Sequence, residues 1–370
     1  MVDLKTQYKK IEDPINKAIQ EILDNAQFIN GPDVKLFADE LAKYLDVKHV
    51  IPCANGTDAL QIAMMALDLQ TDDEVIVPVH TYVATAEAIA LLKLKPVFVD
   101  VNEFDFTIDC SQLESLITPK TKLIVPVHLY GQCANMEQIM NIAAKHNLFV
   151  VEDTAQAIGA DYTFSDGSIK KAGTISHIGT TSFFPSKNLG CYGDGGALMT
   201  NDDELAKKIK MMANHGQSVR YKHDTIGCNS RLDTIQAAIL RVKLPFLDEY
   251  NEARRKAADY YDTHLDSVDG VITPKRASWS THVFHQYTIR LTKANRDEVQ
   301  AKLAEKGVPS MIYYPIPLHY QEGYKMDGFG KGSFPVTELL SDQVLSLPIH
   351  TEMNEELLEF IVNSVKEVLA

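Results

Sequence analysis

The sequence is poor in the residues that build disulfide frameworks and zinc sites. Its 370 residues include five cysteines, which are Cys53, Cys110, Cys133, Cys191 and Cys228. An odd number of widely separated cysteines, with no Cys-x-x-Cys pair, indicates neither a disulfide framework nor a zinc knuckle. We therefore expect reduced thiols with structural roles and no metal site.

Long apolar runs are missing as well. Residues 1–5 open a polar amphipathic stretch that lacks the apolar core of a secretion signal. No segment approaches the ~18 uninterrupted apolar residues of a membrane-spanning helix. These absences predict a cytoplasmic protein that has no membrane partner.

Basic residues are outnumbered, with 36 Lys and Arg against 50 Asp and Glu and a formal net charge of −14. Nucleic acids and anionic membranes reward clustered basic residues, so neither is expected as a partner. A Gly-x-Gly-x-x-Gly fingerprint that opens a helix after the first strand is also lacking, which excludes a dinucleotide-binding dehydrogenase. A small-molecule ligand of another class is expected.

What is present is the composition of a globular protein, with 45% hydrophobic and 23% charged residues. Between about residues 50 and 200, short β-rich runs alternate with helical patterns, as in a mostly parallel sheet. Strands are expected at residues 74–79, 96–101, 122–127, 148–152, 180–184 and 195–200. Helices are expected at residues 85–92, 136–146 and 203–213.

Beyond about residue 235 the pattern changes to that of a second, smaller unit. It predicts a long charged helical stretch at 234–264, strands at 271–274 and 284–291, helices at 296–306 and from Asn354, and a Gly-rich surface loop at 323–335. The predicted fold class is α/β, with a large domain (1–240) built on a mostly parallel mixed sheet flanked by helices. A smaller α+β domain (241–370) follows, and the N-terminal helical segment is expected to pack on it.

Three polar positions follow apolar runs, where ligands bind at the carboxyl ends of strands. Asp153 ends one strand, Lys187 follows another and precedes several flexible glycines, and Gly56-Thr57 opens a helix. Each position also has an ordinary structural interpretation. Asp153 would be a helix cap, Lys187 a solvated surface lysine, and Gly56-Thr57 a simple capping turn. Gly56 and Thr57 equally offer the free N–H groups of a phosphate site.

Taken together, the three positions suit pyridoxal phosphate (PLP). That cofactor needs an amine for a Schiff base, a carboxylate beside its ring nitrogen and donors around its phosphate. Lys187 supplies the amine and, once released, a base and acid for proton transfer. An ionised Asp153 would keep the ring nitrogen protonated through its opposite charge.

Several runs resemble the DegT/StrS family of PLP-dependent sugar aminotransferases. They are residues 54–60, 81–85, 152–156, 182–187, 193–196 and 229–233. The resemblance implies the dimeric fold of type I aminotransferases, with Lys187 as the Schiff-base lysine and Asp153 at the ring nitrogen. It also implies Gln156 near the phenolic oxygen and Tyr82 stacked on the ring. The phosphate would be held by Gly56, Thr57, Ser182 and, from the partner subunit of a homodimer, Asn229.

Within the family, residues 53–61, 130–133, 182–193 and 215–217 are most similar to enzymes that aminate UDP-2-acetamido-2-deoxy-3-oxo-glucuronate for surface polysaccharides. Glutamate is the amino donor that this resemblance implies. Arg231 is a candidate ligand for the sugar nucleotide, since it follows Asn229 by two residues and a guanidinium suits phosphate or carboxylate.

Tyr313, Tyr314 and His319 belong to a turn that resembles the substrate-facing turn of the family. Tyr313 stands where histidine is common, and a phenol carries no positive charge at neutral pH. Two alternatives remain open. One is a dTDP-3-oxo-6-deoxyhexose aminotransferase of the same family, and the other is a non-catalytic regulatory protein that keeps the fold.

Overall fold

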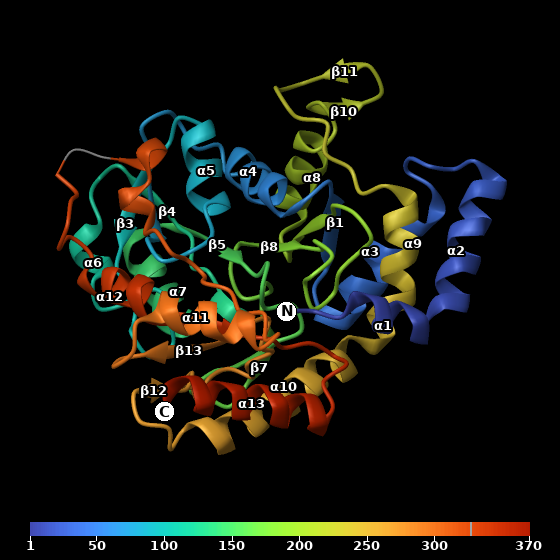
Figure 1. Cartoon of the computed structure of the whole chain (residues 1–370). Coiled ribbons are helices and arrows are strands. Elements are labelled where there is room, and N and C mark those ends of the chain that lie inside the picture. The colour runs from blue at the N-terminus through green and yellow to red at the C-terminus, as the bar shows by residue number, and fades with distance from the viewer. Residues whose placement is uncertain (326–327) are drawn as a thin grey trace.

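A computed structural model of the protein describes residues 1–325 and 328–370. A seven-stranded sheet forms its centre (Figure 1), in the spatial order β1, β9, β8, β5, β4, β2, β3. The strands are β1 (His49–Cys53), β9 (Gly196–Thr200), β8 (Ile178–Ser182), β5 (Phe149–Asp153), β4 (Thr121–Ile124), β2 (Glu74–Pro78) and β3 (Lys95–Val99).

Strand direction determines where functional side chains gather. The neighbours from β8 to β3 are parallel, whereas β9 is antiparallel to both β8 and β1. β1 therefore runs in the same direction as β8. The carboxyl ends of every strand in this sheet except β9 lie at one edge.

Both faces of the sheet are covered, because side chains of a strand alternate between faces. Val75 and Val77 pack with α4 (Gly56–Ala66), α5 (Ala84–Leu91) and α8 (Asp203–Met212). Ile76 packs on the other face with α7 (Met136–His146) and the short α6 (Leu113–Leu116). This double cover explains why the strands read as continuous apolar runs.

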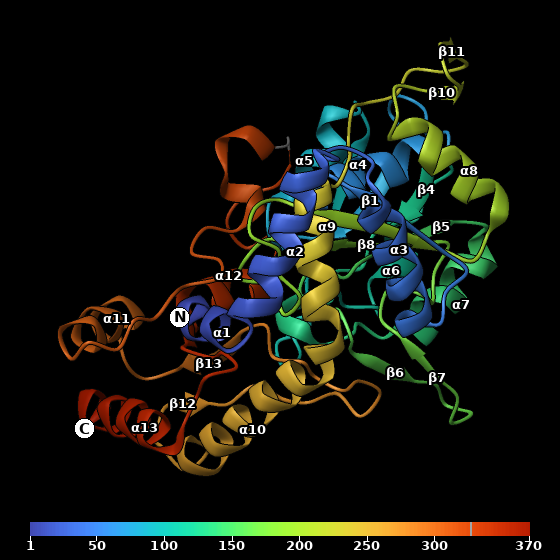
Figure 2. The ribbon, with the colours of Figure 1, turned by 90° about the vertical axis from the view of Figure 1, so that its right-hand side faces the viewer.

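The N-terminal helices lie beside β1 and the helix that begins at Thr234. They are α1 (Leu4–Lys10), α2 (Glu12–Asn25) and α3 (Pro32–Leu45). Figure 2 shows α2 and α3 beside α9 (Thr234–Lys243), and Ile15 of α2 is buried against Ile239. The amine of Lys10 pairs with Glu352 at 2.5 Å, so α1 also contacts the C-terminal part.

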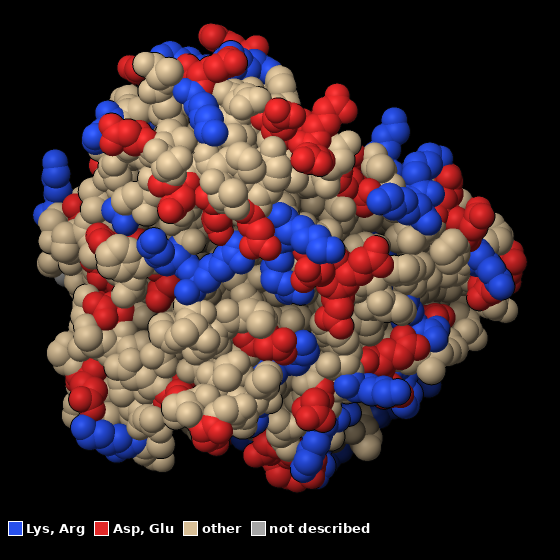
Figure 3. Space-filling view, turned by 90° about the horizontal axis from the view of Figure 1, so that it is seen from below, with Lys and Arg blue, Asp and Glu red and all other residues tan. Residues whose placement is uncertain are grey.

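The C-terminal part has a core of its own around a three-stranded antiparallel sheet. Its strands are β12 (Val271–Ile272), β13 (Tyr287–Leu291) and β14 (Val344–Leu347), and its helices are α10 (Leu247–Leu265), α11 (Arg296–Glu305), α12 (Pro335–Gln343) and α13 (Glu355–Leu369). Figure 3, seen from the lower side of Figure 1, shows acidic and basic side chains intermixed on this face. The domain boundary at residue 240 stays a prediction.

All six predicted strands and all three predicted helices of the central region form, with small shifts at their ends. The long helix predicted over 234–264 is wrong in one respect, since Pro245 divides it into α9, a 3-10 turn (Leu244–Phe246) and α10. The strand predicted from residue 284 begins at Tyr287, because Phe284 has a φ of 44°.

Two hairpins and three short turns complete the described chain. The hairpin of β10 (Gln217–Val219) and β11 (Lys222–His223) stands away from the body in Figures 1 and 2. The other joins β6 (Asp161–Thr163) to β7 (Ile169–Lys171), and 3-10 turns occur at Leu129–Gly131, Leu318–Tyr320 and Glu322–Tyr324. Part of the loop predicted at 323–335, residues 326–327, lies outside the described residues.

Candidate active site

A cavity of about 680 Å³ opens at the edge of the sheet where the parallel strands end. Its walls come from loops after β1, β2, β5 and β8 and from two segments of the C-terminal part. It is lined by Asn55, Gly56, Thr57, Asp58, Leu60, Thr81, Tyr82, Ala84, Val127, Asp153, Ala155, Gln156, Ser182, Phe184, Ser186, Lys187, Asp194, His285, Gln286, Tyr313 and Tyr314.

The N-terminus of α4 forms the anion-binding side of the cavity. Asn55 caps the helix, because its side-chain oxygen accepts the N–H of Asp58 at 2.8 Å. The N–H groups of Gly56 and Thr57 lie in the first turn, where no intrahelical acceptor exists. A Cβ on Gly56 would lie 2.8 Å from Cβ of Ser182, so only glycine lets the two segments meet. A phosphate fits this cradle, where helix dipole and free donors coincide.

Asp153 occupies the carboxyl end of β5 and is buried. The Thr85 hydroxyl donates to its Oδ2 at 2.9 Å, and the backbone N–H of Ala155 donates to Oδ1 at 3.1 Å. These two donors fix the carboxylate at the cavity wall. Its neighbour Glu152 points to the opposite side of the strand, where it accepts bonds from His128 and three backbone N–H groups and is structural.

Lys187 lies in the cavity wall, on the turn that follows β8. Its backbone N–H donates to the carbonyl of Phe184 at 2.8 Å. Enclosure by protein lowers the pKa of its amine to about 8, against the opposing effect of the Asp153 charge. A substantial fraction of the amine is therefore neutral near pH 7 to 8, as a base requires.

The segment after Lys187 makes several buried hydrogen bonds. The amide of Asn188 donates to Oδ1 of Asn251 at 2.7 Å and to the carbonyl of Val283 at 2.9 Å. The buried amine of Lys243 donates to the carbonyl of Gly190 at 2.6 Å. A Cβ on Gly190 would lie 2.4 Å from the carbonyl oxygen of Pro185, so this glycine serves close packing.

Gln156, Tyr82 and Tyr314 form the remaining wall. The Oε1 of Gln156 accepts the backbone N–H of Tyr130 at 2.7 Å, and its Nε2 donates to the Tyr314 hydroxyl at 3.2 Å. The ring of Tyr82 is 56% exposed and lies 6.0 Å from the ring of Tyr314. An exposed aromatic face at a cavity is available for stacking.

The structure brings most of the predicted residues into this cavity. They are Gly56, Thr57, Tyr82, Asp153, Gln156, Ser182, Lys187, Tyr313 and Tyr314.

Three predicted residues do not line it within one chain. Asn229 is exposed and Arg231 is half-buried, close to the hairpin of β10 and β11. His319 is buried, and its Nε2 lies 3.1 Å from Oε1 of Glu338, beside a different hollow.

Other residues that line the cavity or support its walls have no role in the sequence-based prediction. Asn55 carried a readable signal, since an asparagine before a helix is a frequent cap. Thr85 was placed in a helix without a role, although its hydroxyl fixes Asp153. His285 and Gln286 come from the distant C-terminal part, and no local pattern marks them.

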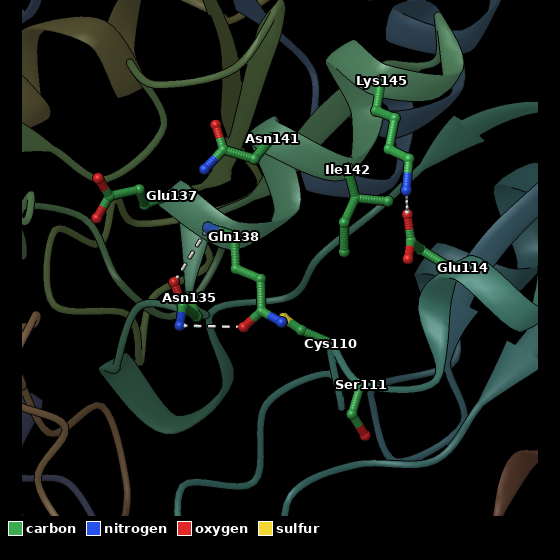
Figure 4. Close-up of a pocket in the computed structure, with 9 residues that line it drawn as sticks. All are labelled: Cys110, Ser111, Glu114, Asn135, Glu137, Gln138, Asn141, Ile142 and Lys145. Carbon is green, nitrogen blue, oxygen red and sulfur yellow. Dashed lines mark hydrogen bonds and ion pairs between the residues drawn. The ribbon is translucent and has the colours of Figure 1, made fainter.

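Another hollow, of about 470 Å³, lies beside α7 (Figure 4). Its charged groups are already paired: the amine of Lys145 lies 2.6 Å from the carboxylate of Glu114, and Glu137 accepts two bonds from Ser165. Among the described residues, no cluster of three or more His, Cys, Asp or Glu could hold a metal ion, and no helix is long and apolar enough to cross a membrane.

Curated relatives are similar over the full length. UDP-2-acetamido-2-deoxy-3-oxo-D-glucuronate aminotransferase of Pseudomonas aeruginosa is 47% identical over 360 residues, 97% of each chain. A pleiotropic regulatory protein of Geobacillus stearothermophilus is 46% identical over 369 residues, 99% of this chain and 97% of that one. UDP-N-acetyl-3-dehydro-alpha-D-glucosamine 3-aminotransferase of Acidithiobacillus ferrooxidans is 44% identical over 369 residues, 100% and 97% of the two chains.

Solved structures share the fold. DesV of S. venezuelae, in complex with a ketimine intermediate, matches with a TM-score of 0.95 and 38% identity, covering 100% of this chain and 97% of that one. NtdA of Bacillus subtilis with bound PMP matches with a TM-score of 0.88 and 34% identity, covering 96% and 81%. The predicted aminotransferase fold is confirmed. A model of the DegT/DnrJ/EryC1/StrS aminotransferase family matches residues 9–366, and the chain belongs to that family.

Proposed function

We propose that the protein uses PLP to transfer an amino group from glutamate to the keto group of a nucleotide-linked sugar. The preferred substrate is UDP-2-acetamido-2-deoxy-3-oxo-glucuronate, and the amino sugar product serves surface polysaccharide biosynthesis. One observation carries the proposal: an enclosed lysine amine, a fixed carboxylate and the N-terminus of a helix line the same cavity.

The residues present fit PLP by their chemistry. Gly56, Thr57 and Ser182 would hold the phosphate, Asp153 the ring nitrogen and Lys187 the aldehyde carbon. When bound, the cofactor supplies an electron sink for the carbon that loses a proton. Tyr82 would cover one face of the ring. Gln156, whose side chain is bonded to the Tyr130 backbone and the Tyr314 hydroxyl, would meet the phenolic oxygen of the cofactor.

Lys187 would move the proton in each half-reaction. Its lowered pKa lets the neutral amine accept a proton near pH 8, and the ammonium then returns it. Asp153 stays fixed by Thr85 and Ala155 throughout, so its negative charge remains in one place. Such preorganised charge requires no rearrangement during the reaction.

The sugar assignment rests on the relatives that act on UDP-linked 3-oxo sugars. Arg231 is proposed as a contact for a phosphate or carboxylate of this substrate, and Tyr313 and Tyr314 as contacts from the cavity wall. His319 remains a proposal of the same kind, although its Nε2 meets Glu338.

A homodimer with shared sites is part of the proposal. Asn229 is exposed, close to a hairpin whose Tyr221 is 80% exposed and whose flanking Ile226 is 86% exposed. Exposed apolar side chains of this kind are typical of interfaces. Asn229 would then reach the phosphate from the partner subunit.

The test is a pair of half-reactions followed by absorbance. The purified, PLP-loaded protein is converted to its amino form with glutamate, then mixed with UDP-2-acetamido-2-deoxy-3-oxo-glucuronate or with dTDP-linked 3-keto sugars. Return of the PLP spectrum with the UDP sugar alone supports the proposal. Return with a dTDP sugar alone contradicts the substrate, and dependence on a donor other than glutamate contradicts the donor.

A regulatory role is the second candidate, because one relative at 46% identity has that name. A protein that only binds partners has no need for the full set of Lys187, Asp153 and the helix cradle. If the protein bound no PLP, or bound it without reacting with any amino donor, the catalytic proposal would fail and the regulatory one would stand.

A further inference from the structure

Tyr130 lies behind the wall of the cavity and is 2% exposed. Its backbone N–H donates to Oε1 of Gln156 at 2.7 Å, and its carbonyl accepts the N–H of Gln286 at 3.2 Å. Its hydroxyl donates to the carbonyl of Tyr313. Gln156, Gln286 and Tyr313 all line the cavity, whereas Tyr130 does not. One buried residue therefore joins three wall segments that lie far apart in the sequence.

The direction of each bond follows from the groups involved. A backbone N–H can only donate, so an oxygen of Gln156 faces Tyr130 and the amide nitrogen is left for the Tyr314 hydroxyl at 3.2 Å. A carbonyl can only accept, so the single hydroxyl proton of Tyr130 goes to Tyr313. The Nε2 of His80 lies 3.2 Å from the same hydroxyl and therefore donates to it. Burial lowers the pKa of His80 to about 4, so this donor is a neutral ring.

The backbone of the turn that carries Tyr130 is pressed against the C-terminal part. Tyr130 has a φ of 58°, which bulky side chains rarely adopt. Gly131 follows with a φ of 108°, and a Cβ there would lie 2.9 Å from the backbone nitrogens of Phe284 and His285. The Gly131 carbonyl accepts the N–H of Val283 at 2.9 Å. Backbone strain of this kind persists where the surroundings fix it, and it concentrates at functional sites.

The contacts of Tyr130 close a ring at one side of the cavity. From the Tyr130 N–H the ring passes through the Gln156 amide to the Tyr314 hydroxyl. It continues along the chain to the Tyr313 carbonyl and returns to the Tyr130 hydroxyl. Neither Gln156 nor Tyr313 can move away without leaving a buried group of Tyr130 unpaired, which is costly. The ring therefore fixes the spacing between Gln156 and the segment of Tyr313 and Tyr314.

We propose that Tyr130 is a positioning residue, which holds Tyr313 and Tyr314 at a fixed distance from Gln156 and so determines how well the cavity accepts the sugar substrate. The bond to Tyr313 involves neither Lys187 nor the carboxylate of Asp153. Its loss should therefore weaken sugar binding more than it slows proton transfer. The inference rests on the proposed function, because Tyr313 and Tyr314 are proposed there as contacts of the sugar.

Tyr261 offers a matched control in the core of the C-terminal part. It is fully buried, its hydroxyl donates to the carbonyl of Pro348 at 2.8 Å, and it does not line the cavity. Phenylalanine at either position removes one hydroxyl-to-carbonyl bond and keeps the ring. At Tyr130 the edge-on contact with Phe106, at 5.2 Å between ring centres, is retained. The two variants thus make the same chemical change in different places.

The first experiment measures amide hydrogen exchange in the cofactor-free protein by mass spectrometry. In Tyr130→Phe, the peptide that covers residues 312–320 should exchange about fivefold faster than in the unaltered protein, because the segment loses the bond to the Tyr313 carbonyl. Tyr261→Phe should leave the exchange of this peptide unchanged.

The second experiment measures both half-reactions of the PLP-loaded variants. For Tyr130→Phe, the half-saturating concentration of UDP-2-acetamido-2-deoxy-3-oxo-glucuronate should rise about tenfold, and the maximal rate should change by less than about threefold. Both constants for glutamate should stay within about threefold of their original values. A merely structural role would reduce the amount of folded protein and slow the two half-reactions equally. Tyr261→Phe should leave all four constants unchanged.

A double variant tests whether the ring acts as one unit. Tyr130→Phe and Tyr314→Phe break the same ring, so their combined loss in sugar binding should be smaller than the product of the two single losses. Tyr261→Phe combined with Tyr314→Phe should give a loss equal to the product.

The inference is overturned if residues 312–320 exchange equally in Tyr130→Phe and the unaltered protein, if both half-reactions slow equally, or if the losses of Tyr130→Phe and Tyr314→Phe multiply. Absence of amino transfer to any nucleotide sugar in the unaltered protein would refute the proposed function instead. The exchange measurement needs neither PLP nor turnover, so it still decides whether Tyr130 holds this part of the wall.

Discussion

Replacing Lys187 by methionine is expected to stabilise the cofactor-free protein while removing amino transfer. Methionine fills a similar volume without a charge, whereas the lysine ammonium loses solvation in the cavity wall. The pKa of this amine falls from its ordinary 10.5 to about 8. At about 1.4 kcal/mol per tenfold change in proton affinity, that displacement corresponds to roughly 3 kcal/mol of unfavourable charge burial. Water in the open cavity reduces the expected gain to about 1–2 kcal/mol.

The pH dependence distinguishes this effect from simple packing. The folded amine has the lower pKa, so between pH 8 and 10.5 the unfolded chain binds more protons and stability rises with pH. The destabilising effect of the enclosed Lys187 ammonium is fully present below pH 8 and fades as pH rises toward 10.5. By pH 10 only roughly a quarter of it should remain. The methionine variant should therefore have its largest advantage near pH 7.

Urea unfolding of both cofactor-free proteins, at one protein concentration and at pH 7 and 10, measures the difference. Lys243→Met is the matched control, since Lys243 is also buried with a pKa lowered to about 8. Its amine donates to Gly190 and lies over the Tyr192 ring at 4.9 Å, so its removal should destabilise the protein at pH 7. A Lys187→Met advantage that is absent, or equal at both pH values, would refute the reasoning.

Three further changes test the cradle, the carboxylate and the sugar contact. Asp153→Asn keeps the shape but removes the charge, so PLP should bind more weakly by about tenfold or more and amino transfer should fall at least 100-fold, measured by spectral titration and half-reaction rates. Gly56→Ala places a methyl group 2.8 Å from Cβ of Ser182 and should weaken PLP binding at least tenfold. An unchanged dissociation constant for PLP would show that the N-terminus of α4 does not bind the phosphate. Arg231→Ala should slow only the sugar half-reaction, by roughly 10- to 100-fold, and an equal loss in the glutamate half-reaction would contradict a substrate contact.

The sequence was informative wherever a local rule decides the structure. Strands buried on both faces must be apolar for their whole length, so β2 and β5 were readable, and polar residues at their ends marked the cavity. Asp153 and Lys187 were visible because Asp153 is the last residue of β5 and Lys187 lies on the turn that follows β8. The break at Pro245 was also readable in principle, since proline removes a helical hydrogen bond.

What could not be read depends on contacts between distant segments. β1 pairs with β9 across about 150 residues of chain, a match that no local pattern encodes. His285 reaches the cavity only because Arg254 and the 3-10 turn at Leu129–Gly131 hold its backbone there. The proposed role of Asn229 depends on a partner subunit, whose placement no local sequence pattern encodes.

The division of the cavity walls along the chain also has a consequence for the newly made protein. The last strand of the large sheet, β9, ends at Thr200, whereas the walls near Lys187 are completed only by His285 and Tyr314. Because chains emerge from the ribosome N-terminus first, the sheet can assemble while Lys187 is still in water. We therefore expect the Lys187 amine to be more solvated during that interval, and the burial that lowers its pKa to be complete only when the C-terminal part is in place.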